Sequence, residues 1–182
     1  MSKTDLPILE QRRIEANIIK PIYDEMVAEV GAERAKSILK NAIVKNAISH
    51  GKAYADTQEK DTSLLSFHAL LPQWMANGAL EIDVLQENEN NVDYNVTRCR
   101  FAEMYADMGL GEIGHILSCS RDGTFCTGYD PKIKLDRSQT IMEGASHCDF
   151  RYHYSSDNAN PNYDGPNHNG PSHKDSGDDK DT

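Results

Sequence analysis

Several features that would place a protein in a familiar functional class are missing from this sequence. No apolar run approaches the roughly 20 residues that a membrane-spanning helix needs. The first stretch, MSKTDLPILEQRRIEAN, lacks the apolar core of about 7–15 residues that a secretory signal contains. We therefore expect a cytoplasmic protein without a membrane partner.

Basic residues are also scarce. The 19 lysines and arginines are outnumbered by 29 aspartates and glutamates, which gives a formal net charge of −10. A nucleic-acid-binding protein needs a basic surface to neutralise phosphates, so this composition argues against a nucleic-acid partner. A small molecule is the expected substrate, and the oligomeric state stays open, a homo-oligomer included.

Cysteine is present, but not in a zinc-binding pattern. The four cysteines stand at positions 99, 119, 126 and 148, with no CxxC pair among them. Structural zinc sites use closely spaced pairs, so such a site is not expected. In a reducing cytoplasm these residues are core residues, ligands or nucleophiles rather than disulfides.

The last 28 residues contain almost nothing that could form a core. Residues 155–182 have no aliphatic side chain larger than alanine, and their six aspartates and two lysines give a net charge of −4. Such a segment cannot bury enough apolar surface to order itself. We expect a disordered polar tail at 155–182 and a single α+β domain at 1–154, with a helical part at 1–78 and the sheet and site at 79–154.

The helical part follows from apolar spacing. Residues 6–30 carry apolar side chains four apart, at Ile14, Ile18, Ile22, Met26 and Val30, which predicts a helix with these residues along one face that drifts slowly around it. A second helix is expected from Ala32 into the 50s, and a third, shorter one after Thr62. These helices should pack on one another and on one face of a sheet.

The sheet is predicted from alternation of apolar and polar residues. The pattern changes from helical to period two near Gly78, and it predicts an antiparallel sheet of about four strands at 79–87, 92–98, 132–140 and 148–154. Between the second and third strands we expect two short helices. The second of them should end at Cys119, where Ser120–Gly123 resembles a turn.

Strand alternation places charged and reactive side chains on the apolar face. Arg98 continues the alternation of the second strand, Arg137 that of the third, and Cys148 begins the fourth facing inward. A buried guanidinium is costly unless an anion meets it. Cys119 and Asp122 lie at the expected helix end and turn, and His147 precedes Cys148. These residues are the candidate site, although buried cysteines and arginine–carboxylate pairs are also ordinary core features.

The same region resembles a known family. The segments TRCRFAEMYADMGLGEIGHILSCSRD and PKIKLDRSQTIMEGASHCDFRYHY are similar to the L-2-amino-thiazoline-4-carboxylic acid hydrolase family of bacterial proteins, with a resemblance over roughly residues 7–154. The matching positions are Arg98, Cys99, Cys119, Asp122, Arg137, Thr140, Gly144, Cys148, Phe150 and Arg151.

The resemblance implies a hydrolase that opens the ring of a small cyclic amidine or cyclic amide at a carbon–nitrogen bond. The namesake reaction converts L-2-amino-thiazoline-4-carboxylate to a carbamoyl-cysteine. Arg98, Arg137 and Arg151 are then the candidate substrate-binding residues, because a guanidinium matches a carboxylate in geometry and charge.

Three mechanisms are compatible with the sequence. Cys119 or Cys148 attacks directly, or His147 or Asp122 activates a water molecule, or a divalent metal bound by these four residues assists. No cofactor is required by the sequence. The competing functional hypotheses are a non-catalytic domain that binds a small anion or senses redox state, and a purely structural interaction module.

Overall fold

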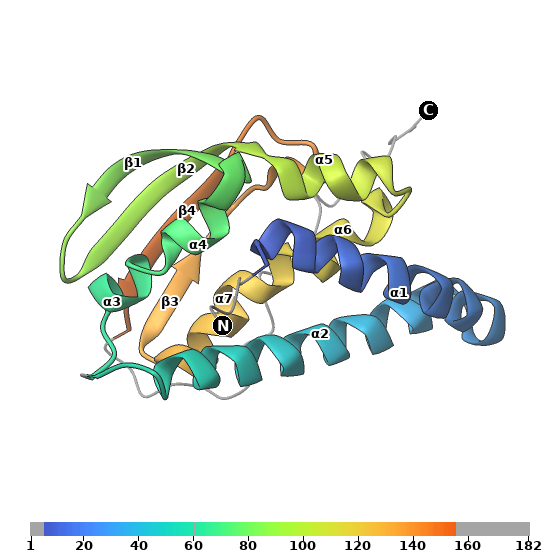
Figure 1. The fold of residues 1–182 in the computed structure, drawn as a ribbon, viewed down its shortest axis with the longest axis horizontal. Helices are drawn as coiled ribbons and strands as arrows, with labels where there is room; N and C mark the ends of the chain where they lie inside the picture. The colour runs from blue at the N-terminus through green and yellow to red at the C-terminus, as the bar shows by residue number, and fades with distance from the viewer. Residues whose placement is uncertain (1–5, 60, 156–182) are drawn as a thin grey trace, which may run out of the picture.

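Two long helices and a four-stranded sheet organise the molecule (Figure 1). The computed structural model describes residues 6–59 and 61–155. Helices α1 (Ile8–Val30) and α2 (Ala32–Ala55) are joined at Gly31, whose φ of 79° lies in the left-handed region that glycine adopts without strain. Apart from Ser155, the tail predicted to be disordered lies outside the described residues.

The sheet confirms the predicted antiparallel architecture. Its strands are β1 (Leu80–Glu87), β2 (Asn91–Cys99), β3 (Ile133–Asp136) and β4 (Cys148–Tyr154), and their order is β1-β2-β4-β3 with every neighbouring pair antiparallel. The third strand is shorter than predicted, because it ends at Asp136. The chain then continues through a 3₁₀ turn, η2 (Ile141–Glu143), before β4 begins.

One face of the sheet is buried under helices. In β2, Val92, Tyr94 and Val96 are buried, whereas Asp93 and Asn95 between them are partly accessible on the outer face. The buried face packs against α3 (Leu64–His68), α4 (Leu71–Met75) and α7 (Cys119–Tyr129), and a 3₁₀ turn, η1 (Ala76–Gly78), leads from α4 towards β1. Since each fully buried side chain of this size contributes about 1.5–3 kcal/mol, this face supplies much of the fold's stability.

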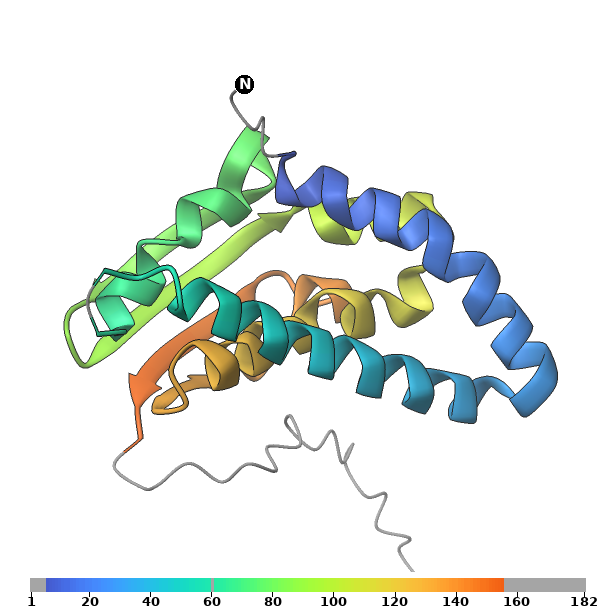
Figure 2. The same ribbon diagram turned by 60° about the horizontal axis from the view of Figure 1, so that its bottom comes forward.

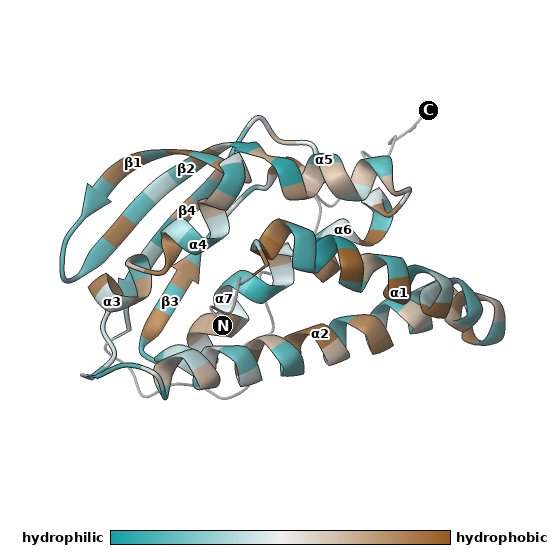
Figure 3. Ribbon diagram, viewed as in Figure 1, coloured by the Kyte–Doolittle hydropathy of each residue, from teal (hydrophilic) through white to brown (hydrophobic). Residues whose placement is uncertain are grey.

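A second apolar cluster lies among the other helices. Buried residues of α1 and α2 pack there with α5 (Arg100–Asp107) and α6 (Gly111–Leu117), including Tyr105, Ile113 and Leu117. Leu80 and Cys99 contact both clusters and so connect the helical part to the sheet. In Figure 3, apolar residues recur along the whole length of α1 and α2.

The buried face of α1 does not follow the four-residue spacing. Ile14, Ile18 and Ile22 are 51%, 61% and 55% exposed, whereas Ala16 and Tyr23 are buried. A spacing of four residues drifts around a helix of 3.6 residues per turn, so it does not define a fixed face. The small side chain of Ala16 lets α1 approach its neighbours closely, and the isoleucines lie on the outside.

Helix α7 occupies the segment that we predicted to be a turn. It begins at Cys119 and runs through Ser120–Gly123 to Tyr129. Its packing against α2 explains this, because a Cβ atom added at Gly51 of α2 would overlap the carbonyl oxygen of Phe125, and one at Gly128 would overlap that of Ile48. The two backbones therefore lie in direct contact (Figure 2). Tertiary packing overrides the weak helix propensity of this segment.

Candidate active site

A cavity of about 350 Å³ lies between the sheet and the helices. This volume suits a small molecule rather than a polymer. Aromatic side chains from three helices and two strands form much of its wall: Phe67, Trp74, Tyr94, Phe125, Phe150 and Tyr152. Four side chains that carry a formal charge also border it, Arg12, Arg121, Asp122 and Arg137, and each is a candidate for ligand recognition.

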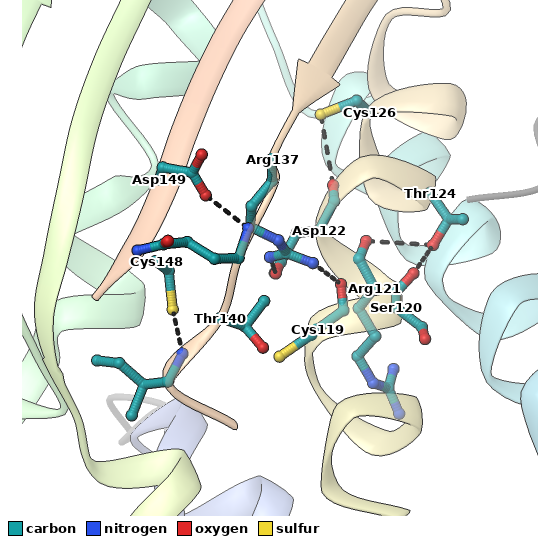
Figure 4. A network of polar contacts seen from close by, with 12 residues as sticks. Cys119, Ser120, Arg121, Asp122, Thr124, Cys126, Arg137, Thr140, Cys148 and Asp149 are labelled. Atoms are coloured by element: carbon teal, nitrogen blue, oxygen red, sulfur yellow. Dashed lines mark hydrogen bonds and ion pairs between the residues drawn. The ribbon is translucent and has the colours of Figure 1, made fainter. Parts of the chain in front are cut away.

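The first polar group is an ion pair between α7 and the segment after β3. Arg137 Nη1 lies 2.5 Å from Asp122 Oδ2, and Arg137 Nη2 donates a hydrogen bond to the carbonyl oxygen of Cys119 at 3.1 Å (Figure 4). The guanidinium carbon stands 4.9 Å from the centre of the Phe150 ring. Asp122 lies in the first turn of α7, where the helix dipole favours a carboxylate.

Burial dominates the electrostatics of this pair. It raises the pKa of Asp122, and the positive charges of Arg137, Arg121 and Arg12 offset this effect only in part. The Asp122 side chain keeps 32% of its surface accessible because it borders the cavity. Burial opposes the charge on Arg137, but the neighbouring Asp122 raises the Arg137 pKa overall. Asp122 is consequently a stronger proton acceptor than an ordinary aspartate.

All four cysteines are free thiols, and three of them border the cavity: Cys99, Cys119 and Cys148. Burial raises the pKa of each, to about 11 for Cys99. At Cys119 the nearby charge of Asp122 adds to this rise, and Arg137 opposes it. At Cys148, the Ile141 amide donates to the sulfur at 3.2 Å, yet the pKa remains raised. A raised pKa disfavours the thiolate form of each of these thiols.

Arg98 lies on the surface, contrary to the prediction that it faces the interior. Its guanidinium pairs with Glu103 at 2.8 Å and Glu81 at 3.3 Å, and 51% of its side chain is exposed. The register of β1 and β2 explains the error, because Glu81 pairs with Arg98 but the next residue pairs with Val96. Thr97 is therefore the extra residue of a β-bulge, which reverses the alternation and turns Cys99 inward instead.

His147 and Arg151 also lie away from the cavity. His147 contacts Ser146 and Gln139 just before β4 and is not among the residues that line the cavity. Arg151 lies between Phe150 and Tyr152, both buried, and so faces outward. It donates to the Phe150 carbonyl and to the Tyr94 carbonyl, at 2.8 and 2.9 Å, and thereby ties β4 to β2.

Arg12, His50 and Arg121 also line the cavity, although the sequence analysis does not assign them to the site. Arg121 was overlooked because Ser120–Gly123 was read as a turn. In a helix, consecutive residues point about 100° apart, so Arg121 and Asp122 reach different parts of the cavity wall. Arg12 and His50 carry no local signal, since α1 and α2 bring them to the cavity only in the folded chain.

The residues named for a metal-assisted reaction do not form a ligand set. Within residues 6–59 and 61–155, no three or more His, Cys, Asp or Glu side chains are arranged to hold a metal ion. Over the same ranges, no helix is both long and apolar enough to span a bilayer.

Comparisons with known proteins identify the family to which the chain belongs. No curated protein matches the chain. Among solved structures, the phenol-responsive sensory domain of the transcription activator PoxR, determined with phenol, aligns with a TM-score of 0.49 and 13% identity over 75% of this chain and 73% of that one. The family model for L-2-amino-thiazoline-4-carboxylic acid hydrolase matches residues 11–152. The chain therefore belongs to the L-2-amino-thiazoline-4-carboxylic acid hydrolase family.

Proposed function

We propose that this protein hydrolyses a carbon–nitrogen bond of a small cyclic amidine or amide that carries a carboxylate, with L-2-amino-thiazoline-4-carboxylate as the model substrate. The observation that carries the proposal is the Asp122–Arg137 pair at the edge of an aromatic cavity of about 350 Å³. Membership of the hydrolase family supports the reaction class. The cavity size supports a substrate of one ring.

Asp122 acts as the general base in this proposal. Its raised pKa makes it a competent proton acceptor for a water molecule that attacks the ring C=N carbon. A carbon–oxygen bond forms, the π bond of the C=N group breaks, and one water proton passes through Asp122 to the ring nitrogen. Asp122 then takes the proton of the new hydroxyl group and gives it to the same nitrogen, as the C=O bond forms and the carbon–nitrogen bond breaks. The nitrogen leaves as an amine with both water protons, and the base is regenerated.

Arg137 positions the base and stabilises charge. A guanidinium has five N–H donors, and the bonds to Asp122 and to the Cys119 carbonyl use two of them among the described residues. The remaining donors can stabilise the negative charge that develops during attack, as preorganised donors do in other hydrolases. Loss of Arg137 would therefore affect both the base and the transition state.

Water is the favoured nucleophile over a cysteine. Burial raises the pKa of Cys119 and Cys148, and the nearby cation, Arg137, is already paired with Asp122. A helix N-terminus favours a thiolate, and Cys119 begins α7, but burial and the charge of Asp122 still leave the Cys119 pKa raised. Both cysteines then serve as wall residues that shape the cavity.

The test compares matched substitutions in the full chain with L-2-amino-thiazoline-4-carboxylate as substrate. Asp122→Asn should lower kcat about 10²–10⁴-fold, the usual contribution of a general base. Cys119→Ser and Cys148→Ser should each change kcat less than about tenfold, since neither sulfur reacts. Asp107→Asn, an exposed acid on α5, is the control for the loss of a carboxylate.

The result that overturns the proposal is an Asp122→Asn variant that folds, by circular dichroism, and keeps kcat within about tenfold of the unsubstituted protein. A large loss in either cysteine variant would instead restore the covalent mechanism. In that case a trapped acyl- or amidino-enzyme should be visible by mass spectrometry.

A second candidate is a non-catalytic domain that binds a small anion. Its favouring observation is that three arginines, Arg12, Arg121 and Arg137, line the cavity, whereas Asp122 is the one carboxylate among the described lining residues. Saturable binding of the carboxylate without turnover by any variant would select this function. Redox sensing is less favoured, because sensor cysteines have a low pKa and these thiols have raised values.

A further inference from the structure

A second group of charged side chains borders the cavity at the end nearest α1. Arg12 Nη1 donates to both carboxylate oxygens of Glu15 at 2.7 Å, and Arg121 Nη2 donates to Glu15 Oε2 at 3.4 Å. Arg121 also donates to Asn46 Oδ1 at 2.7 Å and to the Leu117 carbonyl at 2.8 Å. One carboxylate is thus shared between two guanidinium groups that come from different helices.

The charges of this group do not balance. Arg12 and Arg121 contribute +2 and Glu15 contributes −1, which leaves +1, and His50 beside them can add another positive charge. The folded protein disfavours this excess: burial and the charge of Arg12 lower the pKa of Arg121 to about 10, although Glu15 partly offsets them. A deficit of one negative charge in a mostly buried cluster is the pattern expected of an anion site.

The excess charge is accessible from the cavity. Arg12, His50 and Arg121 line the same cavity as Asp122 and Trp74. The side chains of Arg12 and Arg121 are only 12% and 10% exposed, so little of their charge is screened by bulk water. Arg137, by contrast, is already neutralised by Asp122.

We propose that Arg12 and Arg121 bind the carboxylate of the small molecule that occupies the cavity, with His50 beside it. The choice of a carboxylate rests on the proposed function, whereas the need for an anion rests on the cluster itself. Two guanidinium groups can hold a carboxylate by charge-assisted hydrogen bonds at both oxygens. The ligand then lies with its anionic end towards α1 and α7 and its reacting carbon towards Asp122.

The experiment measures binding without requiring turnover. The sequence has a single tryptophan, Trp74, and it lines the cavity, so its fluorescence reports occupancy directly. The probes are thiazole-4-carboxylate and its neutral amide, thiazole-4-carboxamide. The two probes share one ring and differ only in charge, and neither contains the scissile amidine. The unsubstituted protein should bind the carboxylate at least about tenfold more tightly than the amide, as for a buried charge-assisted contact.

Two substitutions should move this preference in opposite directions. Arg12→Gln brings the cluster to zero net charge and should abolish the preference for the carboxylate. Glu15→Gln brings it to +2 and should increase the preference, an outcome that a purely structural role for these residues does not produce. Arg98→Gln, which removes an exposed arginine outside the cavity, is the matched control and should leave the preference unchanged.

Three outcomes would overturn the assignment: equal binding of the two probes to the unsubstituted protein, no binding of either, or an Arg12→Gln variant that keeps the preference. If Arg12→Gln fails to fold, the Glu15→Gln result decides alone, and a weaker or unchanged preference counts against the site. Failure of the proposed hydrolysis is seen separately, as turnover that does not respond to Asp122→Asn while the carboxylate preference persists.

Discussion

Arginine–carboxylate contacts lie at two ends of one cavity, and the two ends differ in how the charge of the arginines is balanced. At the sheet end, Arg137 faces Asp122 alone, and the pair is neutral. At the helical end, Arg12 and Arg121 share Glu15, and one positive charge is left over. The pKa directions agree with this difference, because the environment raises the pKa of Arg137 and lowers that of Arg121.

The difference suits the two ends of the cavity to different functions. Burial makes each charge of the Asp122–Arg137 pair costly, the attraction between the two charges offsets that cost, and Asp122 can take up or release a proton in the proposed reaction. An unbalanced pair of guanidinium groups is strained in the free protein and is relieved when an anion binds. We therefore expect substitutions at the sheet end to affect stability and chemistry, and substitutions at the helical end to affect ligand affinity.

The largest effect should follow from breaking the balanced pair. Arg137→Met leaves Asp122 buried without its partner and should lower the free energy of unfolding by about 3–5 kcal/mol. Arg121→Met also removes hydrogen bonds but relieves repulsion with Arg12, so we expect a loss of about 1–2 kcal/mol. Urea denaturation at pH 7 measures both. An Arg121→Met loss as large as that of Arg137→Met would remove the distinction between the two ends.

The pH dependence of turnover should reveal the raised pKa of Asp122. A general base works when deprotonated, so kcat/KM should fall about tenfold per pH unit below the apparent pKa. Because the Asp122 pKa is raised from its ordinary value of 3.8, this acid limb should lie above pH 3.8. Pre-steady-state or steady-state rates across pH 4–8 check it, and a limb at or below 3.8 would contradict the role of Asp122 as the base.

The smallest effect concerns His50 at the unbalanced end. Burial and the charges of Arg12 and Arg121 lower the His50 pKa below 6.5, and Glu15 partly opposes them, so His50 is neutral at pH 7. A bound carboxylate would raise the His50 pKa, so His50 would take up a proton when the ligand binds. Affinity should therefore increase as the pH falls below 6.5. Affinity for thiazole-4-carboxylate should rise about threefold from pH 7.5 to 5.5. In His50→Gln this rise should be absent; a rise that persists would assign the proton to another group.

Much of the fold could be predicted from sequence because it depends on local patterns. Alternation of apolar and polar residues identified all four strands, and the strand beginning at Cys148 matched the prediction closely. The third strand ended early, at Asp136, yet Arg137 still borders the cavity as its parity predicted. Period-two patterns are reliable here because one face of the sheet is buried and the other is open.

Local sequence patterns gave a wrong prediction at two places, one in a strand and one in a helix. Arg98 was assigned to the interior, and a bulge at Thr97 moved it to the surface. Ser120–Gly123 looked like a turn, and close packing of α7 on α2 through Gly51 and Gly128 made it helical. Both errors arise from contacts with distant segments, which no local window contains.

The sequence by itself determined the α+β class, the antiparallel sheet, and the presence of Asp122, Arg137, Cys119 and Cys148 in one region, because these follow from periodicity and from motifs within about 50 residues. Only the tertiary structure decided which of these groups share a cavity and what their charges are. Arg12 and Arg121 are over 100 positions apart, and their shared contact with Glu15 exists only after α1 and α7 have packed. Burial likewise sets the protonation of the thiols and of Asp122, because desolvation depends on every surrounding side chain.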